Sequence, residues 1–271
     1  MPTTPDHAET VAGPPQASTE GASPAYDCLV ISDLHLGSDM CNARLLEEFL
    51  GWAVKNSRAL IINGDIFDDL NFTRLTKRHF ACLQIIRKNS DRDDFRLIWI
   101  RGNHDGPADI VSHIVGVKIH DEYIYDNGST RLLILHGDQF DTFIASFKVL
   151  TNIACAIFYW IQRVFPFNAS RWIRRVTKKW QRNSEIVQEQ ALLYARLKKV
   201  PNVTCGHTHL ALTAESHGVR YFNSGTWIES PPCPFVAVRG ALIELRTWPP
   251  AEAGGGGAAT GAAAAAPGDR G

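Results

Sequence analysis

The segments CLVISDLH (28–35), ALIINGDIFD (59–68) and RLIWIRGNHD (96–105) decide the fold of this chain. Each segment begins with a short aliphatic run and ends in Gly, Asp, Asn or His, which is typical of a buried strand that leads into a polar loop. Amphipathic stretches at 45–54 and 74–88 separate the three runs and predict helices. Strands and helices therefore alternate, as in an α/β fold.

Four further apolar runs follow with less helical sequence between them. They predict strands at 131–136, 203–207, 220–225 and 241–245. A strand-rich second half indicates mixed sheets rather than a purely parallel one. We therefore expect one folded domain over about residues 26–248.

Both ends of the chain have a composition that does not support a packed core. Residues 1–25 are rich in Pro, Thr, Ala and Ser and contain no Lys or Arg, so no secretory signal is expected. Residues 249–271 consist largely of Gly and Ala. We predict that both segments are disordered tails.

Charge and cysteine content exclude several classes of protein. The chain of 271 residues has 28 Lys and Arg against 28 Asp and Glu, so its formal net charge is zero. A neutral total argues against a bulk nucleic-acid binder. The 6 cysteines are irregularly spaced and form no CxxC pair, which argues against a zinc ribbon or a thioredoxin-type motif. We expect reduced, buried thiols in a cytoplasmic protein.

A polar cluster follows most of the predicted strands. The clusters are Asp33-Leu34-His35, Gly64-Asp65, Gly102-Asn103-His104-Asp105, His136-Gly137-Asp138 and Gly206-His207-Thr208-His209. Functional groups gather outside the carboxyl ends of strands in open α/β sheets, so we expect all five clusters at one edge. Carboxylate, amide and imidazole donors without thiolate suit Mn, Fe, Zn or Ni. Seven such donors exceed one tetrahedral site and would fill two sites that share a carboxylate.

Each of these residues also has a purely structural interpretation. Asp33, Asp65 and Asn103 could cap helices or turn the chain after a strand, and an isolated histidine is more often structural than a ligand. Such an account must explain seven residues separately, so we favour the metal site. Four other histidines match no motif and are expected to be structural or solvent-exposed, namely His79, His113, His120 and His217.

The order of the motifs resembles that of the calcineurin-like metallophosphoesterase superfamily. DLH, GDIFD, GNHD, HGD and GHTH follow one another as they do in that family. The resemblance implies an α/β (α+β) fold of four layers, with two mixed β-sheets flanked by helices and a helical insertion. It also implies two divalent metal ions as cofactors, with Mn preferred and Fe, Zn or Ni as alternatives.

The resemblance also assigns roles by motif. The first metal site would consist of Asp33, His35, Asp65 and His209, and the second of Asp65, Asn103, His136 and His207. A hydroxide held between the metals would attack phosphorus. His104 would stabilise charge on the phosphoryl group, and the Asp68 carboxylate would orient His104. The adjacent Asp69 leaves open that Asp68 or Asp69 caps the next helix.

The segment 140–199 interrupts the strand pattern and predicts two or three helices that form a lid. Residues 142–184 contain no acid, and aromatic residues lie among the basic ones. One apolar face could shelter acyl chains, and the basic run suits a diphosphate or anionic headgroups. The predicted substrate contacts are Phe147, Ile157, Trp160, Arg171, Arg174 and Arg175. The alternative is a core helix with a solvated basic face. The uncharged run at 149–162 is too short for a transmembrane span.

Two motifs narrow the substrate. HGDQFD (136–141) and NSGTWIES (223–230) resemble the branch that includes UDP-2,3-diacylglucosamine hydrolases. The resemblance implies cleavage of the pyrophosphate of a nucleotide-linked lipid sugar. It also implies peripheral contact with the inner face of the cytoplasmic membrane. His104 stands where the best-known members of that branch carry arginine, so we expect a sister group.

Other functions remain open at this point. A phosphodiesterase or phosphomonoesterase for a soluble substrate would not need an apolar lid. A non-catalytic scaffold would be expected to lose ligands, and all seven are present. A nuclease would use the basic stretch on a phosphate backbone, with affinity that falls steeply with salt. GDIFD lacks the arginine that follows in protein phosphatases, which disfavours that class.

Overall fold

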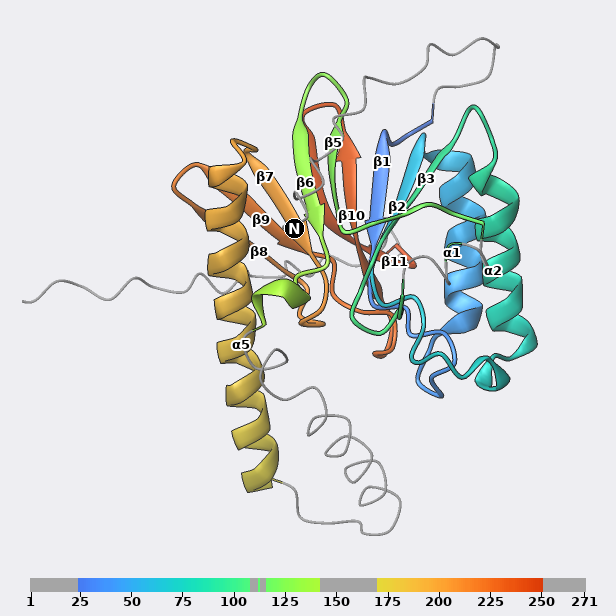
Figure 1. The fold of residues 1–271 in the computed structure, drawn as a ribbon, viewed down its shortest axis with the longest axis horizontal. Coiled ribbons are helices and arrows are strands. Elements are labelled where there is room, and N and C mark those ends of the chain that lie inside the picture. The colour runs from blue at the N-terminus through green and yellow to red at the C-terminus, as the bar shows by residue number, and fades with distance from the viewer. Residues whose placement is uncertain (1–23, 108–111, 113–115, 142–169, 251–271) are drawn as a thin grey trace, which may run out of the picture.

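The structure of the protein, a computed structural model, describes residues 24–107, 112, 116–141 and 170–250, with the backbone alone for 170–181. Two β-sheets pack face to face, and helices cover their outer faces (Figure 1). The predicted α/β arrangement of two sheets flanked by helices is therefore confirmed.

The first sheet has six strands in the order β11-β10-β1-β2-β3-β4. The strands are β1 (Cys28–Ile31), β2 (Ala59–Asn63), β3 (Arg96–Ile100), β4 (Ile119–His120), β10 (Cys233–Arg239) and β11 (Leu242–Trp248). The strands β1 to β4 pair in parallel, and β10 and β11 are antiparallel. Every residue of β1 and β2 is buried, which explains their unbroken aliphatic sequence.

The second sheet has five strands in the order β5-β6-β7-β9-β8. They are β5 (Glu122–Asp126), β6 (Arg131–Leu135), β7 (Asn202–Cys205), β8 (Leu212–Ser216) and β9 (Val219–Asn223). The three inner strands are parallel, and both edge strands pair antiparallel. Both sheets are thus mixed, as the sequence predicts.

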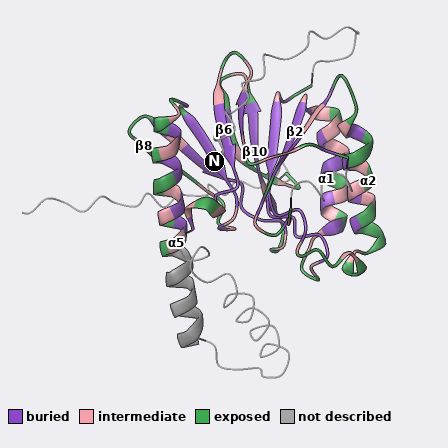
Figure 2. Cartoon of the chain, in the orientation of Figure 1, coloured by how far each residue is buried: buried purple, intermediate pink, exposed green. Residues whose placement is uncertain are grey.

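Helices cover the two outer faces. They are α1 (Ala43–Asn56) and α2 (Lys77–Ser90) on the first sheet and α5 (Ser170–Leu197) on the second. Two short 3₁₀ turns, η1 (Phe72–Arg74) and η2 (Asp138–Phe140), lie in the connecting loops. The buried residues of α1, α2 and the described part of α5 face the sheets (Figure 2). The helix α2 begins later than predicted because Thr76 caps it, accepting from the backbone N–H of His79. His79 is buried there, in agreement with its structural interpretation.

Three hydrophobic cores join the four layers. Phe49 of α1 packs with Trp99 and Phe235 between the helices and the first sheet. A second core lies between the sheets, and a third joins the second sheet to α5 through Val187 and Ala191. Full burial of such an aliphatic or aromatic side chain contributes about 1.5–3 kcal/mol, so each layer is held by several such residues.

The described cysteines are free thiols. Four of them are buried, and Cys41 is half-buried. Burial raises the pKa of Cys41 and of Cys82 to about 12, which keeps these thiols protonated and unreactive at neutral pH.

The sequence prediction missed β4, β5, β8 and β10. Pro234 makes the sequence of β10 untypical of a central strand, because a proline cannot donate to the hydrogen bonds of a sheet. Pro234 pairs with Thr247 of β11, whereas the contact with β1 begins at Val236. The proline therefore lies beyond the part of β10 that is paired on both sides.

The predicted insertion at 140–199 is described in part. The long helix α5 agrees with the helical prediction for this region. The predicted substrate contacts of the lid lie outside the described residues. They are Phe147, Ile157 and Trp160, together with the side chains of Arg171, Arg174 and Arg175. Most of both predicted tails also lies outside the described residues.

Within the described part of the chain, no helix has the length and apolar character needed to cross a bilayer.

Candidate metal centre

The polar clusters meet at one edge of the two sheets. The parallel strands β1, β2 and β3 of the first sheet and β6 and β7 of the second lead into it, at the lower edge in Figure 1. Two groups of possible ligands form there, in each of which the ligand atoms lie within 4.8 Å of one another. The groups are Asp33, His35 and His209, and Asp65, His136 and His207. Each group combines loops from both sheets.

The first group is compact, with Asp33 and His35 buried and His209 partly exposed. His209 Nε2 lies 3.1 Å from Asp33 Oδ1, and His35 Nε2 lies 3.2 Å from His209 Nε2. Burial alone would raise the pKa of Asp33, but the neighbouring His209 outweighs burial and lowers it. Burial lowers the pKa of His35 to about 4, so this imidazole is neutral at pH 7, as a metal ligand must be.

The second group is organised around Asp65. His136 donates from Nδ1 to the carbonyl of Asn63 at 2.8 Å, which directs Nε2 to within 3.3 Å of Asp65 Oδ2. Burial opposes a charged His136, but Asp65 outweighs burial and raises the pKa of His136 well above its usual value. The pKa of Asp65 is lowered in return, against the effect of burial. Asp65 also connects to the first group, because its backbone carbonyl accepts from the N–H of His35 at 3.0 Å.

Buried atoms in both groups fit divalent cations. Asp33 Oδ1, Asn103 Oδ1 and His136 Nε2 are buried and form no hydrogen bond of ordinary geometry with the described residues. Asp33 Oδ1 and His136 Nε2 each face another member of their own group, at 3.1 Å and 3.3 Å. A buried polar atom without a partner costs about 1–3 kcal/mol, so this arrangement calls for a bound group. Carboxylate, amide and imidazole donors suit Mn, Fe, Zn or Ni, and these residues would hold such ions.

Five of the ligand residues have left-handed backbones. Their φ angles are 52° for Asp33, 46° for His35, 51° for Asp65, 63° for His207 and 57° for His209. A non-glycine residue in this region costs about 1–3 kcal/mol and persists only when the surroundings impose it. The fold therefore holds the ligands in positions that the local chain would not adopt alone.

His104 lies at the exposed rim of the site, but its contact with Asp68 differs from the predicted one. His104 Nδ1 donates to the backbone carbonyl of Asp68 at 2.7 Å. The Asp68 carboxylate instead binds Arg74 at 2.7 Å and lies 3.7 Å from His35 Nδ1. The carbonyl orients His104 because the carboxylate is engaged by Arg74, a residue that sequence analysis did not select. Arg74 also binds Asp69 at 2.7 Å, so it fixes both carboxylates of this loop.

Asp105 is a second residue that sequence analysis did not assign, although it ends the GNHD motif. It is fully buried and accepts from the backbone N–H groups of Asp65 at 3.0 Å, Ile66 at 2.8 Å and Gly102 at 2.9 Å. The Trp99 indole donates to it as well, at 3.2 Å. Asp105 therefore ties the loop after β2 to the loop after β3.

Asp141 is the third unassigned residue, at the end of the HGDQFD motif. Its Oδ2 accepts from His207 Nε2 at 3.0 Å. A histidine that donates from Nε2 keeps the Nδ1 lone pair for a metal. A carboxylate that accepts this hydrogen bond raises the basicity of the histidine as a metal ligand. The second aspartate of HGDQFD (136–141) is the sequence feature from which this role could have been predicted.

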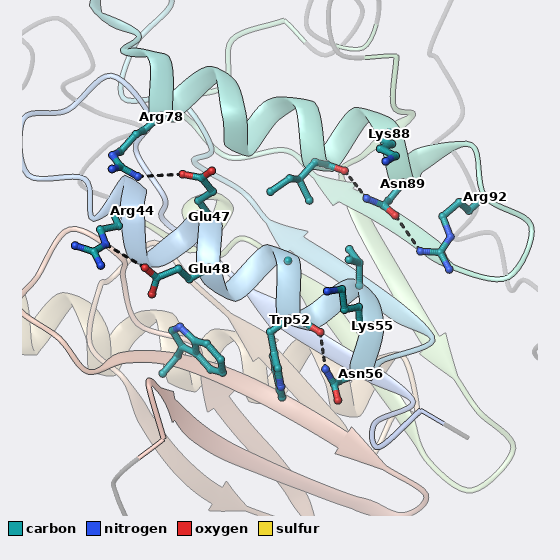
Figure 3. A pocket seen from close by; sticks show the side chains of 14 residues that line it. Arg44, Glu47, Glu48, Trp52, Lys55, Asn56, Arg78, Lys88, Asn89 and Arg92 are labelled. Atoms are coloured by element: carbon teal, nitrogen blue, oxygen red, sulfur yellow. Dashed lines mark hydrogen bonds and ion pairs between the residues drawn. The ribbon is translucent and has the colours of Figure 1, made fainter. Parts of the chain in front are cut away.

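A groove of about 1060 Å³ lies elsewhere, between α1, α2 and the end of β11 (Figure 3). The rings of Trp52 and Trp248 lie 4.9 Å apart along it, and Arg78 pairs with Glu47 across its wall at 3.3 Å. Among the residues that line the groove, none belongs to either ligand group. The groove is therefore separate from the metal centre.

Adding Mn²⁺ to the metal-free protein near pH 6.5 should release protons. Asp65 and Asp33 raise the pKa values of His136 and His209 above 6.5, so both rings are protonated there and must lose a proton to bind metal. Mn²⁺ affinity should therefore rise with pH and level off above the raised pKa values. Calorimetry in buffers of different ionisation enthalpy measures this release. An affinity that does not change between about pH 6 and 8 would contradict the assignment.

Several solved structures are similar to this chain, at low sequence identity and low TM-score. A predicted phosphoesterase from Streptococcus pneumoniae is 15% identical, with a TM-score of 0.40, over 82% of this chain and 97% of that chain. The phosphoesterase YfcE from Escherichia coli is 14% identical, with a TM-score of 0.44, over 81% and 91%. Vps29 from Chaetomium thermophilum is 13% identical, with a TM-score of 0.43, over 80% and 85%. Similarity this low carries no argument about activity.

A search of curated protein sequences gives no match. A family model described as calcineurin-like phosphoesterase matches residues 27–211. That span begins just before β1 and ends just after the second histidine of GHTH, so it contains both ligand groups. The chain therefore belongs to the calcineurin-like phosphoesterase family.

Proposed function

We propose that this phosphoester hydrolase cleaves the pyrophosphate of a nucleotide-linked lipid sugar such as UDP-2,3-diacylglucosamine, using two divalent metal ions, with Mn preferred. The observation that carries the hydrolase is the pair of adjoining ligand groups with His104 at their rim. The lipid substrate is supported by the likeness of HGDQFD and NSGTWIES to that branch.

The chain's own residues have distinct tasks in this reaction. Divalent ions, when bound, would supply Lewis acidity and a water of lowered pKa. Asp33 and Asp65 are held ionised by His209 and His136 and would neutralise the metal charge. His104 contacts the backbone carbonyl of Asp68 through Nδ1, which leaves Nε2 as the ring nitrogen for a phosphoryl or leaving oxygen.

The NSGTWIES segment supports the first group directly. The backbone N–H of Trp227 donates to the carbonyl of Asp33 at 3.0 Å, and Thr226 Oγ1 donates to the same carbonyl at 3.1 Å. These bonds hold Asp33 in its left-handed conformation.

A substrate whose acyl chains lie in a bilayer would require peripheral contact with the inner face of the cytoplasmic membrane, and we include that contact in the proposal.

Incubation with UDP-2,3-diacylglucosamine and Mn²⁺ should release UMP. UDP-N-acetylglucosamine, which lacks the two acyl chains, is the matched substrate. Because each buried CH₂ contributes about 0.8 kcal/mol, kcat/KM should favour the acylated substrate by about 100-fold or more. UMP release is measured by chromatography.

The outcome of this comparison separates the lipid substrate from its main alternative. Turnover of a soluble diester such as bis(p-nitrophenyl) phosphate without UMP release would leave the metal centre intact. That result would replace the lipid substrate by a soluble phosphoester, which the histidine at position 104 also accommodates.

A further inference from the structure

Helix α5 contacts two of the three loops that carry the second ligand group, namely those after β6 and β7. Asn183 donates from Nδ2 to Asp141 Oδ2 at 2.8 Å, and the same oxygen accepts from His207 Nε2 at 3.0 Å. One residue further on, Ser184 Oγ donates to Thr208 Oγ1 at 3.4 Å. Two consecutive residues of α5 therefore reach the GHTH loop, one of them through Asp141.

These contacts are shielded from water. Asp141, Ser184 and Thr208 are 5%, 3% and 4% exposed. On the next turn of α5, Val187 lies so close to the loop after β6 that a Cβ on Gly137 would come within 3.2 Å of its Cγ1. Buried hydrogen bonds in a packed setting keep their geometry and are stronger than exposed ones.

The helix is fixed to the body of the protein just beyond these contacts. Val187, Ala191 and Ala195 are fully buried against the second sheet. In Figure 1, α5 lies along the outer face of this sheet and continues past its edge toward lower residue numbers. Asn183 therefore stands where the anchored part of α5 passes the metal centre.

We propose that Asn183 is a positioning residue that acts through Asp141 to hold the His207 ring with Nδ1 toward the second metal. One carboxylate oxygen accepts both donors, so Asn183 fixes the Asp141 side chain and Asp141 fixes the ring. Without Asn183, the Asp141 side chain loses one of the hydrogen bonds that hold it, and the His207 ring is held less firmly. This inference rests on the proposed metal centre but is independent of the lipid substrate.

Replacing Asn183 by Leu should weaken the binding of one of the two Mn²⁺ ions by about 3–10-fold. This is near the lower end of the loss of metal affinity seen when a residue that supports a metal ligand is replaced. Equilibrium dialysis of the full chain measures both affinities without any substrate. Gln190→Leu is the control, because Gln190 lies exposed on the same helix and the change also replaces an amide by an aliphatic group. Equal Mn²⁺ binding in the two variants would overturn the role of Asn183.

A double-mutant cycle tests whether Asn183 acts through Asp141. Asp141→Asn should weaken one Mn²⁺ site by about 10–100-fold. Adding Asn183→Leu to it should change the affinity little further, whereas fully additive effects would overturn the relay.

Metal-free protein provides an independent readout. NMR of the histidine ring nitrogens should find His207 as the Nε2–H tautomer in the wild type and a mixture of tautomers in Asn183→Leu. An unchanged single tautomer would overturn the inference. A wild-type chain with this tautomer that binds no Mn²⁺ would instead overturn the metal centre, and the inference with it.

Discussion

Asp65→Asn should abolish hydrolysis, lowering kcat by about 10³-fold or more, which corresponds to about 4 kcal/mol of transition-state stabilisation. Asp65 is buried, and its two oxygens have different partners: Oδ1 accepts from the backbone N–H of His104 at 2.9 Å, and Oδ2 faces His136. An asparagine keeps the shape and the first of these bonds. It removes the negative charge that both ligand groups share.

The metal content should fall together with the activity. Without the charge of Asp65, the pKa of His136 falls, because Asp65 makes the largest contribution to raising it, and the site offers one anionic ligand fewer. Metal analysis after gel filtration should find at least one Mn²⁺ lost per chain. Asp91→Asn is the control, because Asp91 binds Arg87 and Ser90 at the exposed end of α2, where such an ion pair contributes about 0–1 kcal/mol. A variant with both metals and normal turnover would rule out Asp65 as the shared ligand.

The clustering of the candidate ligands could be predicted from sequence because each one stands at a short distance from a strand end. The aliphatic runs of β1, β2 and β3 place their carboxyl ends side by side, and Asp33, Asp65 and Asn103 follow within three residues of those ends. No long-range information is needed for that step. The same reasoning extends to His136 and His207, which follow β6 and β7.

The interactions behind the ligands could not be predicted, because they depend on contacts between distant segments. Asp141 and Asn183 are far apart in sequence and meet only once α5 packs on the second sheet. The contact between Asp68 and His104 differs from the predicted one for a similar reason, since Arg74 binds the Asp68 carboxylate and His104 meets the backbone carbonyl. Sequence patterns identify a donor or acceptor but do not decide which of its atoms is used.

Gly102→Ala should destabilise the metal-free protein by about 3 kcal/mol, at the upper end of the usual range for overpacking, and should disrupt the second ligand group. A Cβ at Gly102 would lie 2.1 Å from Asp65 Oδ1 and 2.3 Å from the Asp65 backbone nitrogen. The neighbouring backbone cannot easily retreat, because Asp105 Oδ2 accepts from the N–H groups of both Asp65 and Gly102. Urea unfolding in chelator measures this cost without the contribution of bound metal.

Gly51→Ala provides the matched control and should have the opposite sign. Gly51 lies inside α1, and a Cβ there meets nothing within 4 Å, so alanine should stabilise the helix by about 0.5–1 kcal/mol. Both substitutions add the same methyl group and restrict the unfolded chain equally, so the difference between them isolates the crowding at the metal centre. If Gly102→Ala were as stable as Gly51→Ala, the loops after β2 and β3 would be free to separate. The ligand positions would then not be imposed by the close approach of these loops, and the left-handed conformation of Asp65 would need another cause.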